Sequence, residues 1–272
     1  VEGPRAGSFV AIKRLSPAMA TNPEAVDLFS AEADILSRLR HPNIIQTHEV
    51  GELGGQRYLV MEAIDGRDLG QIIRRCRDRS ILLPTDFACF LVKSVLDAID
   101  CAHHAKGQGG AELKLVHCDI SPQNVFISRL GEIKLGDFGL AQAENTKSDK
   151  VRGKPAYLSP EAIGGSITVQ ADLWAAGVML YQLLTLELPF VGETTEKLLQ
   201  SIEKRRLRPA EKLRPDLPAP LLGIIRRAFE KKPQHRFASA AQFAAALTSL
   251  FDPNVGTPLA IAAVVRGLFS GS

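Results

Sequence analysis

The chain has 272 residues, enough for one large domain or two lobes, and its 45% hydrophobic and 23% charged residues exclude a disordered or fibrous protein. The formal net charge of +3 gives no reason to expect nucleic acid as a partner, and the apolar tract at 258–269 is too short to span a membrane. The chain has four cysteines, Cys76, Cys89, Cys101 and Cys118, and their spacing suits neither zinc nor a disulfide framework. This favours a reducing, cytoplasmic setting.

Residues 8–15 have the alternation of a β-strand, and one face of that strand carries Phe9, Ala11, Lys13 and Leu15. Lys13 therefore shares a face with apolar neighbours. A lysine in this position either keeps an edge strand soluble or is a cation with a dedicated partner. The pattern alone leaves both interpretations open.

Residues 23–40 predict a helix that Asn22 caps and Pro23 begins. Its apolar stripe consists of Val26, Phe29, Ile35, Leu36 and Leu39. Glu32 falls within this stripe, where an unpaired buried carboxylate costs several kcal/mol or changes its protonation. Glu32 therefore either has a partner in the core, or lies at the stripe edge and reaches solvent or Arg40.

Further alternating segments at 45–51 and 56–61 continue the small sheet, and Asp65-Gly66 predicts a turn after them. From Leu69 onward the pattern becomes helical. A long helix with a wide apolar face ends near His103 and His104, which we expect to interact with the helix C-terminus rather than with a shared metal.

The most informative stretch is 116–141. Two short apolar strands, 125–127 and 133–135, predict a hairpin. Asp119 and Asn124 precede the hairpin and Asp137 follows it, so its closure brings all three side chains to one end. Taken singly, each has a simpler interpretation, as a turn cap, the start of a strand or a surface turn residue.

The spacing His117-x-Asp119-x-x-x-x-Asn124, followed by Asp137-Phe138-Gly139, resembles the catalytic and metal-binding loops of protein kinases, in particular bacterial kinases of the eukaryotic serine/threonine type. Each piece is a weak signal, but the ordered set rarely arises by chance. Later motifs match too, and they build the platform for a protein substrate: the Ser159-Pro160-Glu161 segment, an Asp172 that anchors the catalytic loop, and an Arg236 that pairs with Glu161.

The resemblance implies an α+β fold with two lobes. Residues 1–64 are expected to form an incomplete, β-rich N-terminal lobe, 65–251 a helical C-terminal lobe, and 252–272 an extension with a short amphipathic helix. Only Gly3 and Gly7 precede the Lys13 strand. We therefore expect the glycine-rich loop that covers the phosphates to lie before residue 1, which implies an N-terminal truncation.

By the same resemblance, Lys13 aligns the phosphates of ATP and Glu32 fixes Lys13. Asp119 orients the acceptor hydroxyl and takes its proton, while Asn124 and Asp137 hold Mg²⁺. At the lobe junction, the backbone of Glu62 and Ile64 contacts adenine, Met61 lies behind it and Asp68 reaches the ribose. The complete nucleotide-binding set is Ala11, Lys13, Met61, Glu62, Ile64, Asp68, Phe126 and Asp137.

Two further departures from the family pattern carry predictions. Cys118 replaces the arginine that receives a phosphorylated activation-segment residue, so we expect activity that does not depend on phosphorylation of Thr146 or Ser148. Ser121 replaces a catalytic-loop lysine, whereas Lys154 stands where a threonine is usual. One hypothesis is that Lys154 restores the missing charge in catalysis; the alternative is a surface lysine that faces the substrate.

The sequence therefore predicts a kinase that transfers the γ-phosphoryl group of Mg-ATP to serine or threonine hydroxyls of protein substrates, and it leaves the oligomeric state open. Two alternatives remain. The missing glycine-rich loop and Cys118 favour a pseudokinase that binds ATP and regulates a partner. A small-molecule phosphotransferase of the same fold is the other.

Overall fold

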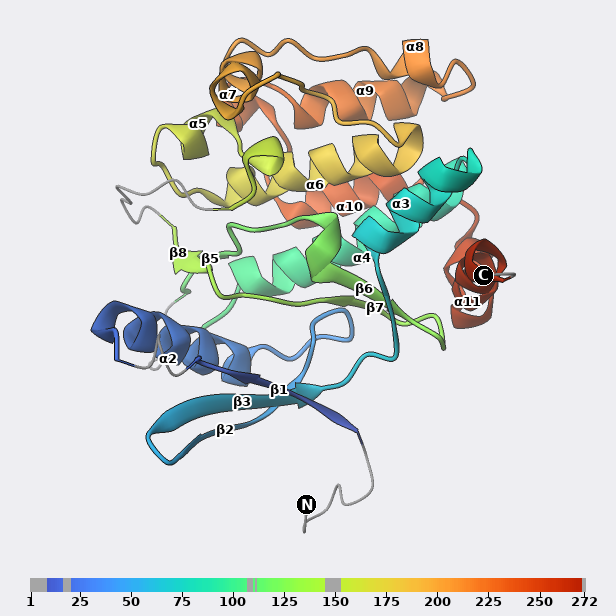
Figure 1. Ribbon diagram of the computed structural model, residues 1–272. Coiled ribbons are helices and arrows are strands. Elements are labelled where there is room, and N and C mark those ends of the chain that lie inside the picture. The colour runs from blue at the N-terminus through green and yellow to red at the C-terminus, as the bar shows by residue number, and fades with distance from the viewer. Residues whose placement is uncertain (1–8, 17–20, 107–109, 111, 145–152, 271–272) are drawn as a thin grey trace.

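The computed structural model describes residues 9–16, 21–106, 110, 112–144 and 153–270, and it shows an α+β fold with two lobes (Figure 1). The smaller lobe is built on a three-stranded antiparallel sheet, and the larger lobe is mostly helical. The strands are β1 (Val10–Arg14), β2 (Thr47–Leu53), β3 (Gln56–Glu62), β4 (Gly66–Asp68), β5 (Leu115–Val116), β6 (Val125–Ser128), β7 (Ile133–Leu135) and β8 (Gln142–Ala143).

The helices confirm the predicted fold class, whereas the predicted domain boundaries near residues 64 and 252 stay predictions. The α-helices are α2 (Pro23–Arg38), α3 (Leu69–Arg79), α4 (Thr85–His103), α5 (Pro160–Ile163), α6 (Val169–Thr185), α7 (Thr195–Glu203), α8 (Ala210–Leu213), α9 (Ala219–Ala228), α10 (Ala240–Thr248) and α11 (Pro258–Phe269). The short 3₁₀ helices are η1 (Pro122–Asn124), η2 (Pro155–Tyr157), η3 (Pro233–His235) and η4 (Pro253–Gly256).

In the smaller lobe, β3 lies between β1 and β2, and α2 packs against the sheet. The antiparallel register places Lys13 opposite Leu59 and Ala11 opposite Met61. Glu32 lies on the buried face of α2 with only 5% of its surface exposed. The expectation that this carboxylate turns inward is therefore confirmed. A buried carboxylate requires a partner inside the protein.

The connection between the lobes contains a strand that the sequence did not reveal. β4 pairs antiparallel with β6 of the larger lobe, with Gly66 opposite Ser128. The turn predicted at Asp65-Gly66 is therefore wrong for Gly66, which begins this strand. A Cβ atom at Gly66 would lie 1.9 Å from the carbonyl oxygen of Ile127. Glycine is needed here for close backbone approach, which its sequence context does not distinguish from a turn.

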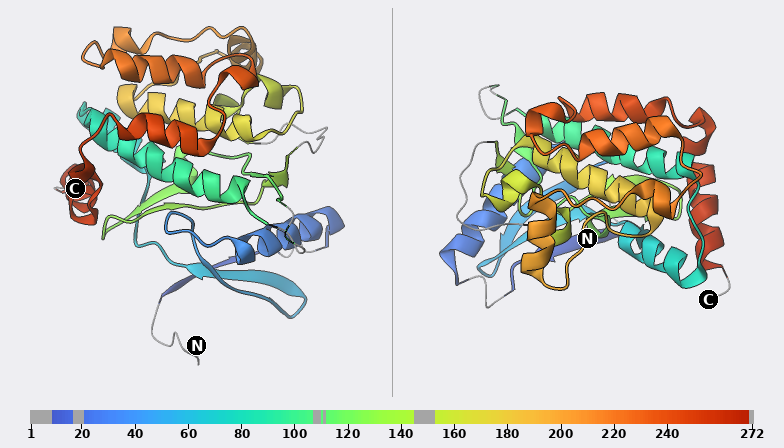
Figure 2. Two further views of the ribbon diagram at one scale, coloured as in Figure 1. Left: turned by 180° about the vertical axis from the view of Figure 1, so that it is seen from behind. Right: turned by 90° about the horizontal axis from the view of Figure 1, so that it is seen from above.

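The larger lobe is organised around α6, which packs between α4 and α9, while α10 covers α4 (Figure 2). Residues 172–185 of α6 are all buried. A helix that is apolar on all sides is expected in the centre of a core. Trp174 of this helix stacks on Phe190, with ring centroids 5.4 Å apart, and meets the edge of Phe229 at 5.1 Å.

The predicted ion pair between Glu161 and Arg236 is confirmed. The two guanidinium nitrogens Nη1 and Nη2 lie 2.6 and 2.8 Å from the two carboxylate oxygens. Arg236 is fully buried, donates to the carbonyl oxygens of Glu230 and Gln170 and lies over the Trp174 ring. The pair thereby attaches the end of the 153–161 segment to the helical core.

Replacing Arg236 with alanine is expected to lower the free energy of unfolding by about 3–5 kcal/mol, because it leaves Glu161 without its partner inside the protein. Urea unfolding followed by circular dichroism measures this loss. Arg226→Ala is the matched control, since Arg226 forms a similar pair with Glu211 at 2.9 Å but both side chains are exposed. Equal losses in the two variants would show that the buried pair has no special structural role.

The C-terminal helix α11 has the predicted bounds and amphipathic character, since it buries Ile261, Ala262, Val265 and Leu268. It packs against α3 and β6 at one side of the larger lobe (Figure 2). Arg75 of α3 donates to the carbonyl oxygen of Leu268 at 2.9 Å, which satisfies a free carbonyl in the last turn. Among the described residues, no helix is long and apolar enough to cross a membrane.

Candidate active site

The site lies where the two lobes meet, and Lys13 of β1 connects them. Its amine nitrogen Nζ lies 2.6 Å from Oε1 of Glu32 and 3.0 Å from Oδ1 of Asp137. Glu32 belongs to α2 of the smaller lobe, whereas Asp137 follows β7 of the larger lobe. The predicted pairing of Lys13 with Glu32 is confirmed. The alternative pairing with Arg40 is wrong, because Arg40 donates to the carbonyl oxygen of Leu39 instead.

Burial and opposite charge act against each other on these three groups. Burial lowers the pKa of Lys13, but the two carboxylates together raise it by more than burial lowers it. The net pKa of Lys13 is therefore above its ordinary value. Burial raises the pKa of Asp137, but the Lys13 ammonium outweighs it and the net pKa is lowered. For Glu32 burial dominates, and its pKa is raised despite Lys13. Asp137 is therefore ionised at neutral pH, which is the state in which a carboxylate can bind a hard cation.

Replacing Lys13 with methionine is expected to destabilise the protein most near neutral pH. In the wild type the lowered pKa of Asp137 contributes stability above the pKa of the unfolded chain, and this contribution is lost as pH falls through the folded pKa. Without Lys13, burial and the nearby Asp137 charge raise the pKa of Glu32 unopposed, so Glu32 binds its proton more tightly in the folded state and stability rises as pH falls. Unfolding free energies measured from about pH 7 to about pH 4 test this.

The control for this variant is Lys197→Met, because Lys197 of α7 pairs with Glu193 just before that helix and both side chains are exposed. Its effect on stability is expected to be small and to vary little over the same pH range. A constant difference between wild type and Lys13→Met at every pH would contradict the assigned charge coupling.

Asp119 and Asn124 lie side by side in the 117–124 loop. The Nδ2 atom of Asn124 donates to the carbonyl oxygen and to Oδ2 of Asp119, both at 2.8 Å. Oδ2 also accepts from Nζ of Lys154 at 2.9 Å, and Nζ lies 2.9 Å from Oγ of Ser121. The second carboxylate oxygen, Oδ1, is buried and has no hydrogen-bond partner among the described residues.

The β6–β7 hairpin closes as predicted and brings its two polar ends together. Val125 pairs with Leu135, and the backbone nitrogen of Gly136 donates to the carbonyl oxygen of Asn124 at 2.9 Å. Asp137 is the next residue, so it lies at the same end of the hairpin as Asn124. It has φ +59°. A non-glycine residue in this conformation is strained, and such strain is concentrated at functional sites.

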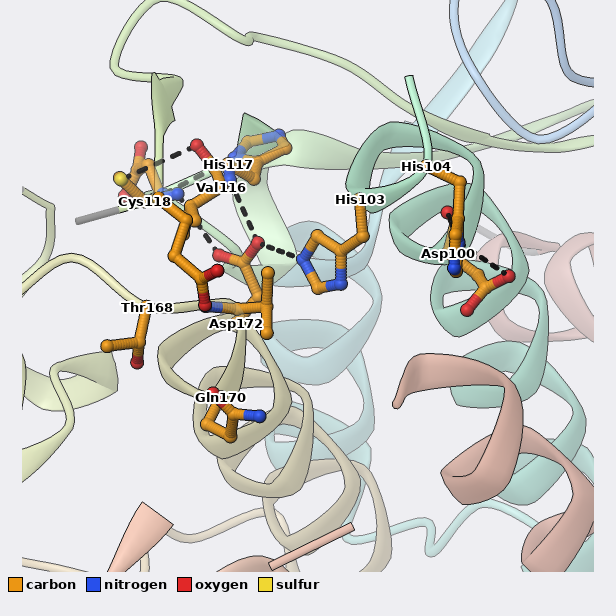
Figure 3. Close-up of polar contacts among 12 residues, drawn as sticks. Asp100, His103, His104, Val116, His117, Cys118, Thr168, Gln170 and Asp172 are labelled. Carbon is orange, nitrogen blue, oxygen red and sulfur yellow. Dashed lines mark hydrogen bonds and ion pairs between the residues drawn. The ribbon is translucent and has the colours of Figure 1, made fainter. Parts of the chain in front are cut away.

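Asp172 of α6 holds the backbone of the 117–124 loop (Figure 3). Its Oδ2 accepts from the backbone nitrogen of His117 at 2.8 Å, and its Oδ1 accepts from that of Cys118 at 3.1 Å. Nε2 of His103 lies 2.9 Å from the same Oδ2. The predicted anchoring role of Asp172 is confirmed. Cys118 itself has φ +66°, so these bonds fix a strained backbone next to Asp119.

Two histidines of the site have contacts that sequence reasoning missed. His103 was expected to act at the helix C-terminus, but its ring is buried against Asp172, 69 positions away in the sequence, which no local pattern reveals. His117 is fully buried between loops: Nδ1 accepts from the backbone nitrogen of Asp119 at 3.3 Å, and Nε2 lies 3.2 Å from the carbonyl oxygen of Gly136. Burial lowers the pKa of His117, so the neutral ring joins the Asp119 and Asp137 loops.

The residues predicted to line a nucleotide site surround the lobe junction. Ala11 and Met61 are paired across β1 and β3, and Phe126 is paired with Asp68 across β6 and β4. Asp68 also caps α3, since its Oδ1 accepts from the backbone nitrogen of Gln71 at 2.9 Å. Among the described residues only Oδ1 has a hydrogen-bond partner, so Oδ2 is available for another contact.

Glu62 and Ile64 begin the connection between lobes. The Glu62 carboxylate forms an ion pair with Lys134 at 2.8 Å, and its backbone nitrogen donates to the carbonyl oxygen of Gln46 at 2.9 Å. Ile64 is half-buried beside them. Four residues considered in the sequence lie outside the described residues: Gly3, Gly7, Thr146 and Ser148.

Comparison with known proteins supplies the family. The model of the protein kinase domain matches residues 4–247. The chain belongs to the protein kinase family. The crystal structure of the PknI kinase domain of Mycobacterium tuberculosis matches this kinase with a TM-score of 0.66 and 31% identity, covering 91% of this chain and 88% of that one.

Curated relatives of this kinase include enzymes named for tyrosine and enzymes named for serine or threonine as the acceptor. The tyrosine-protein kinase MasK of Myxococcus xanthus is 35% identical over 90% of this chain, and the serine/threonine-protein kinase PrkC of Bacillus subtilis is 34% identical over 89%. The serine/threonine-protein kinase PknA of Mycobacterium tuberculosis is 31% identical over 90%. The matched region spans 39%, 36% and 56% of these three proteins, so the kinase corresponds to only part of each.

Proposed function

We propose that this kinase transfers the γ-phosphoryl group of Mg-ATP to serine or threonine hydroxyls of protein substrates. The observation that carries the proposal is the Lys13 amine, which joins Glu32 of one lobe to Asp137 of the other. This contact places a cation and a metal-binding carboxylate at the lobe junction. Asp119 and Asn124 lie near that carboxylate in the folded chain. Phosphoryl transfer depends on such positioning of charge more than on covalent chemistry.

Asn124 and Asp137 fit a magnesium site. Mg²⁺ is bound by one or two protein groups together with phosphate oxygens and water, so a dedicated cluster of protein ligands is not required. The Nδ2 group of Asn124 donates to two oxygens of Asp119. The Oδ1 atom of Asn124 is therefore turned away from Asp119. Asp137 is ionised, and Lys13 and the backbone of Gly139 hold its carboxylate in place for a cation. When bound, Mg²⁺ neutralises phosphate charge.

Asp119 is the proposed proton acceptor. Its Oδ2 is held by Asn124 and Lys154, which fixes the carboxylate, and its buried Oδ1 lacks a protein partner among the described residues. An oriented carboxylate with a free oxygen can accept the proton of an acceptor hydroxyl. Lys13 holds the phosphates in place, and Glu32 keeps its amine in position.

The proposed site for the nucleotide base lies between Ala11 and Met61 on one side and Phe126 on the other. The backbone of Glu62 and Ile64 supplies the edge that recognises adenine, and Ile64 has no backbone hydrogen bond among the described residues. Asp68 Oδ2 reaches the ribose. A cytoplasmic location is part of this proposal, and the use of ATP and the four free cysteines support it.

The acceptor residue is tested by phosphoamino-acid analysis of a generic protein substrate that the purified protein has labelled with [γ-³²P]ATP. We expect phosphoserine and phosphothreonine. Label in phosphotyrosine alone would replace the serine/threonine proposal with a tyrosine specificity. Label in sugars or aminoglycosides but not in protein would support a small-molecule phosphotransferase. Nucleotide binding without any transfer would support a pseudokinase.

A further inference from the structure

Lys154 is the described basic residue that contacts Asp119, and it comes from a different segment of the chain. Its Nζ lies 2.9 Å from Asp119 Oδ2 and 2.9 Å from Ser121 Oγ. Ser121 is fully buried, whereas the Lys154 side chain is 39% exposed. The amine therefore extends past a buried hydroxyl to the carboxylate, and it is not a free surface lysine.

The backbone around Lys154 is fixed by close packing against the 117–124 loop. Gly153 has φ +92°, and a Cβ atom there would lie 2.5 Å from the carbonyl oxygen of Cys118. After Lys154, the helix η2 begins, and the Tyr157 hydroxyl donates to Oε1 of Gln182 in the core at 2.5 Å. The position of the amine thus follows from the main chain on both sides of Lys154.

The amine also has capacity for a further ligand. An ammonium group donates three hydrogen bonds, and Asp119 and Ser121 account for two of them. No other described residue accepts from this amine, so its third donor can serve a group that arrives beside Asp119. In a phosphoryl transfer, negative charge on the phosphoryl oxygens is stabilised by cations fixed in advance.

We propose that Lys154 is a catalytic residue that stabilises the transferring phosphoryl group, and this rests on the function proposed above. Lys154 would supply the positive charge that Ser121, in place of a catalytic-loop lysine, does not provide. In the step it serves, the acceptor oxygen forms a bond to the γ-phosphorus while the bond to the β,γ-bridging oxygen breaks. The hydroxyl proton passes to Asp119, and ADP leaves with the electron pair of the broken bond. Lys154 keeps its proton throughout.

The contact between Lys154 and Ser121 makes the proposal testable by exchange. The two side chains touch, so moving the lysine to position 121 and a small hydroxyl to position 154 keeps an amine beside Asp119. Lys154→Thr is expected to lower kcat by about 10²-fold. The double variant Ser121→Lys, Lys154→Thr is expected to recover at least about tenfold of that loss, whereas Lys197→Thr on the surface of α7 leaves kcat unchanged.

A binding measurement without turnover gives the second readout. Calorimetric titration compares ADP with a non-hydrolysable ATP analogue, which differs by the γ-phosphate. We expect Lys154→Thr to lose part of the preference for the analogue and the double variant to regain it. Circular dichroism establishes that each variant is folded.

Three outcomes would overturn the role of Lys154. An unchanged kcat with a raised KM for the protein substrate would make it a substrate contact. A higher kcat in Lys154→Thr would make it a clamp that restrains Asp119. Lys154 would be structural if Lys154→Thr lost activity but kept the preference for the analogue, and if the folded double variant recovered no activity. In each case wild-type transfer and its loss in Asp119→Asn would still support the proposed kinase function.

Discussion

Replacing Asp119 with asparagine is expected to lower kcat for protein phosphorylation by about 10²–10⁴-fold while the protein stays folded. The amide oxygen can take the place of Oδ2, which accepts from Asn124 and Lys154. The amide nitrogen then takes the place of Oδ1, where it cannot accept a proton. Initial rates with saturating ATP and protein substrate measure the loss, and the KM for ATP should change little.

The matched control is Asp78→Asn, an aspartate on the exposed surface of α3. It removes the same charge from the protein, so it separates a local effect from a change in net charge. Near-normal kcat in Asp119→Asn would refute the assignment of Asp119 as proton acceptor. Unfolding of that variant in circular dichroism would make its rate uninformative, and Asp119→Glu would then test whether a misplaced carboxylate still fails.

Asp137→Asn is expected to lower kcat by about 10³-fold, because a neutral ligand binds Mg²⁺ weakly and several kcal/mol of charge stabilisation is lost. The variant also removes one of the two carboxylates that hold Lys13. The fold should persist, since Lys13 keeps Glu32 and Asp137 is 54% exposed. Initial rates measured at increasing Mg²⁺ should show partial recovery at high metal concentration.

Asp34→Asn serves as the control for Asp137→Asn. Asp34 is 60% exposed and pairs with Arg38 at 2.7 Å, so the substitution breaks a similar exposed ion pair away from the site. We expect its rate and its Mg²⁺ dependence to match the wild type. The metal role of Asp137 would be excluded if Asp137→Asn kept both the wild-type rate and the wild-type Mg²⁺ requirement.

Much of the site follows from local sequence. The β6–β7 hairpin is specified by alternating apolar residues and a glycine turn, so Asn124 and Asp137 had to meet at its end. Glu32 was identifiable because a carboxylate within an apolar helix stripe requires a partner, and Lys13 was a cation on a strand face with apolar neighbours. Periodicity and the cost of a buried charge therefore marked both residues as candidates, whereas their pairing was expected only from the resemblance to protein kinases.

Other features depend on contacts that periodicity does not encode. His103 ends a helix, and only the packing of α4 against α6 brings it to Asp172. Gly66 has the same local context as a turn glycine, but the approach of β6 makes it part of a strand. The meeting of Lys154 with Ser121 depends on how the 153–161 segment folds back onto the 117–124 loop.

The position of Lys13 at the junction of the lobes couples lobe movement to the geometry of the site. Lys13 contacts groups from both lobes, so relative movement of the lobes changes the distance between its amine and Asp137. His117 and Asp172 hold the loops of the larger lobe as one unit. The smaller lobe therefore controls whether the Lys13 amine lies near the end of the hairpin that carries Asn124 and Asp137.

The central claim is that Lys13 and Asp137 together hold a nucleotide through Mg²⁺, and calorimetric titration of the purified protein with a non-hydrolysable ATP analogue tests it most directly. We predict that Mg²⁺ tightens binding by at least about tenfold, or about 1.4 kcal/mol, in the wild type, and that Asp137→Asn removes this gain while Lys13→Met weakens binding with or without metal. Equal affinity with and without Mg²⁺ in the wild type, or an unchanged Mg²⁺ effect in Asp137→Asn, would contradict the account.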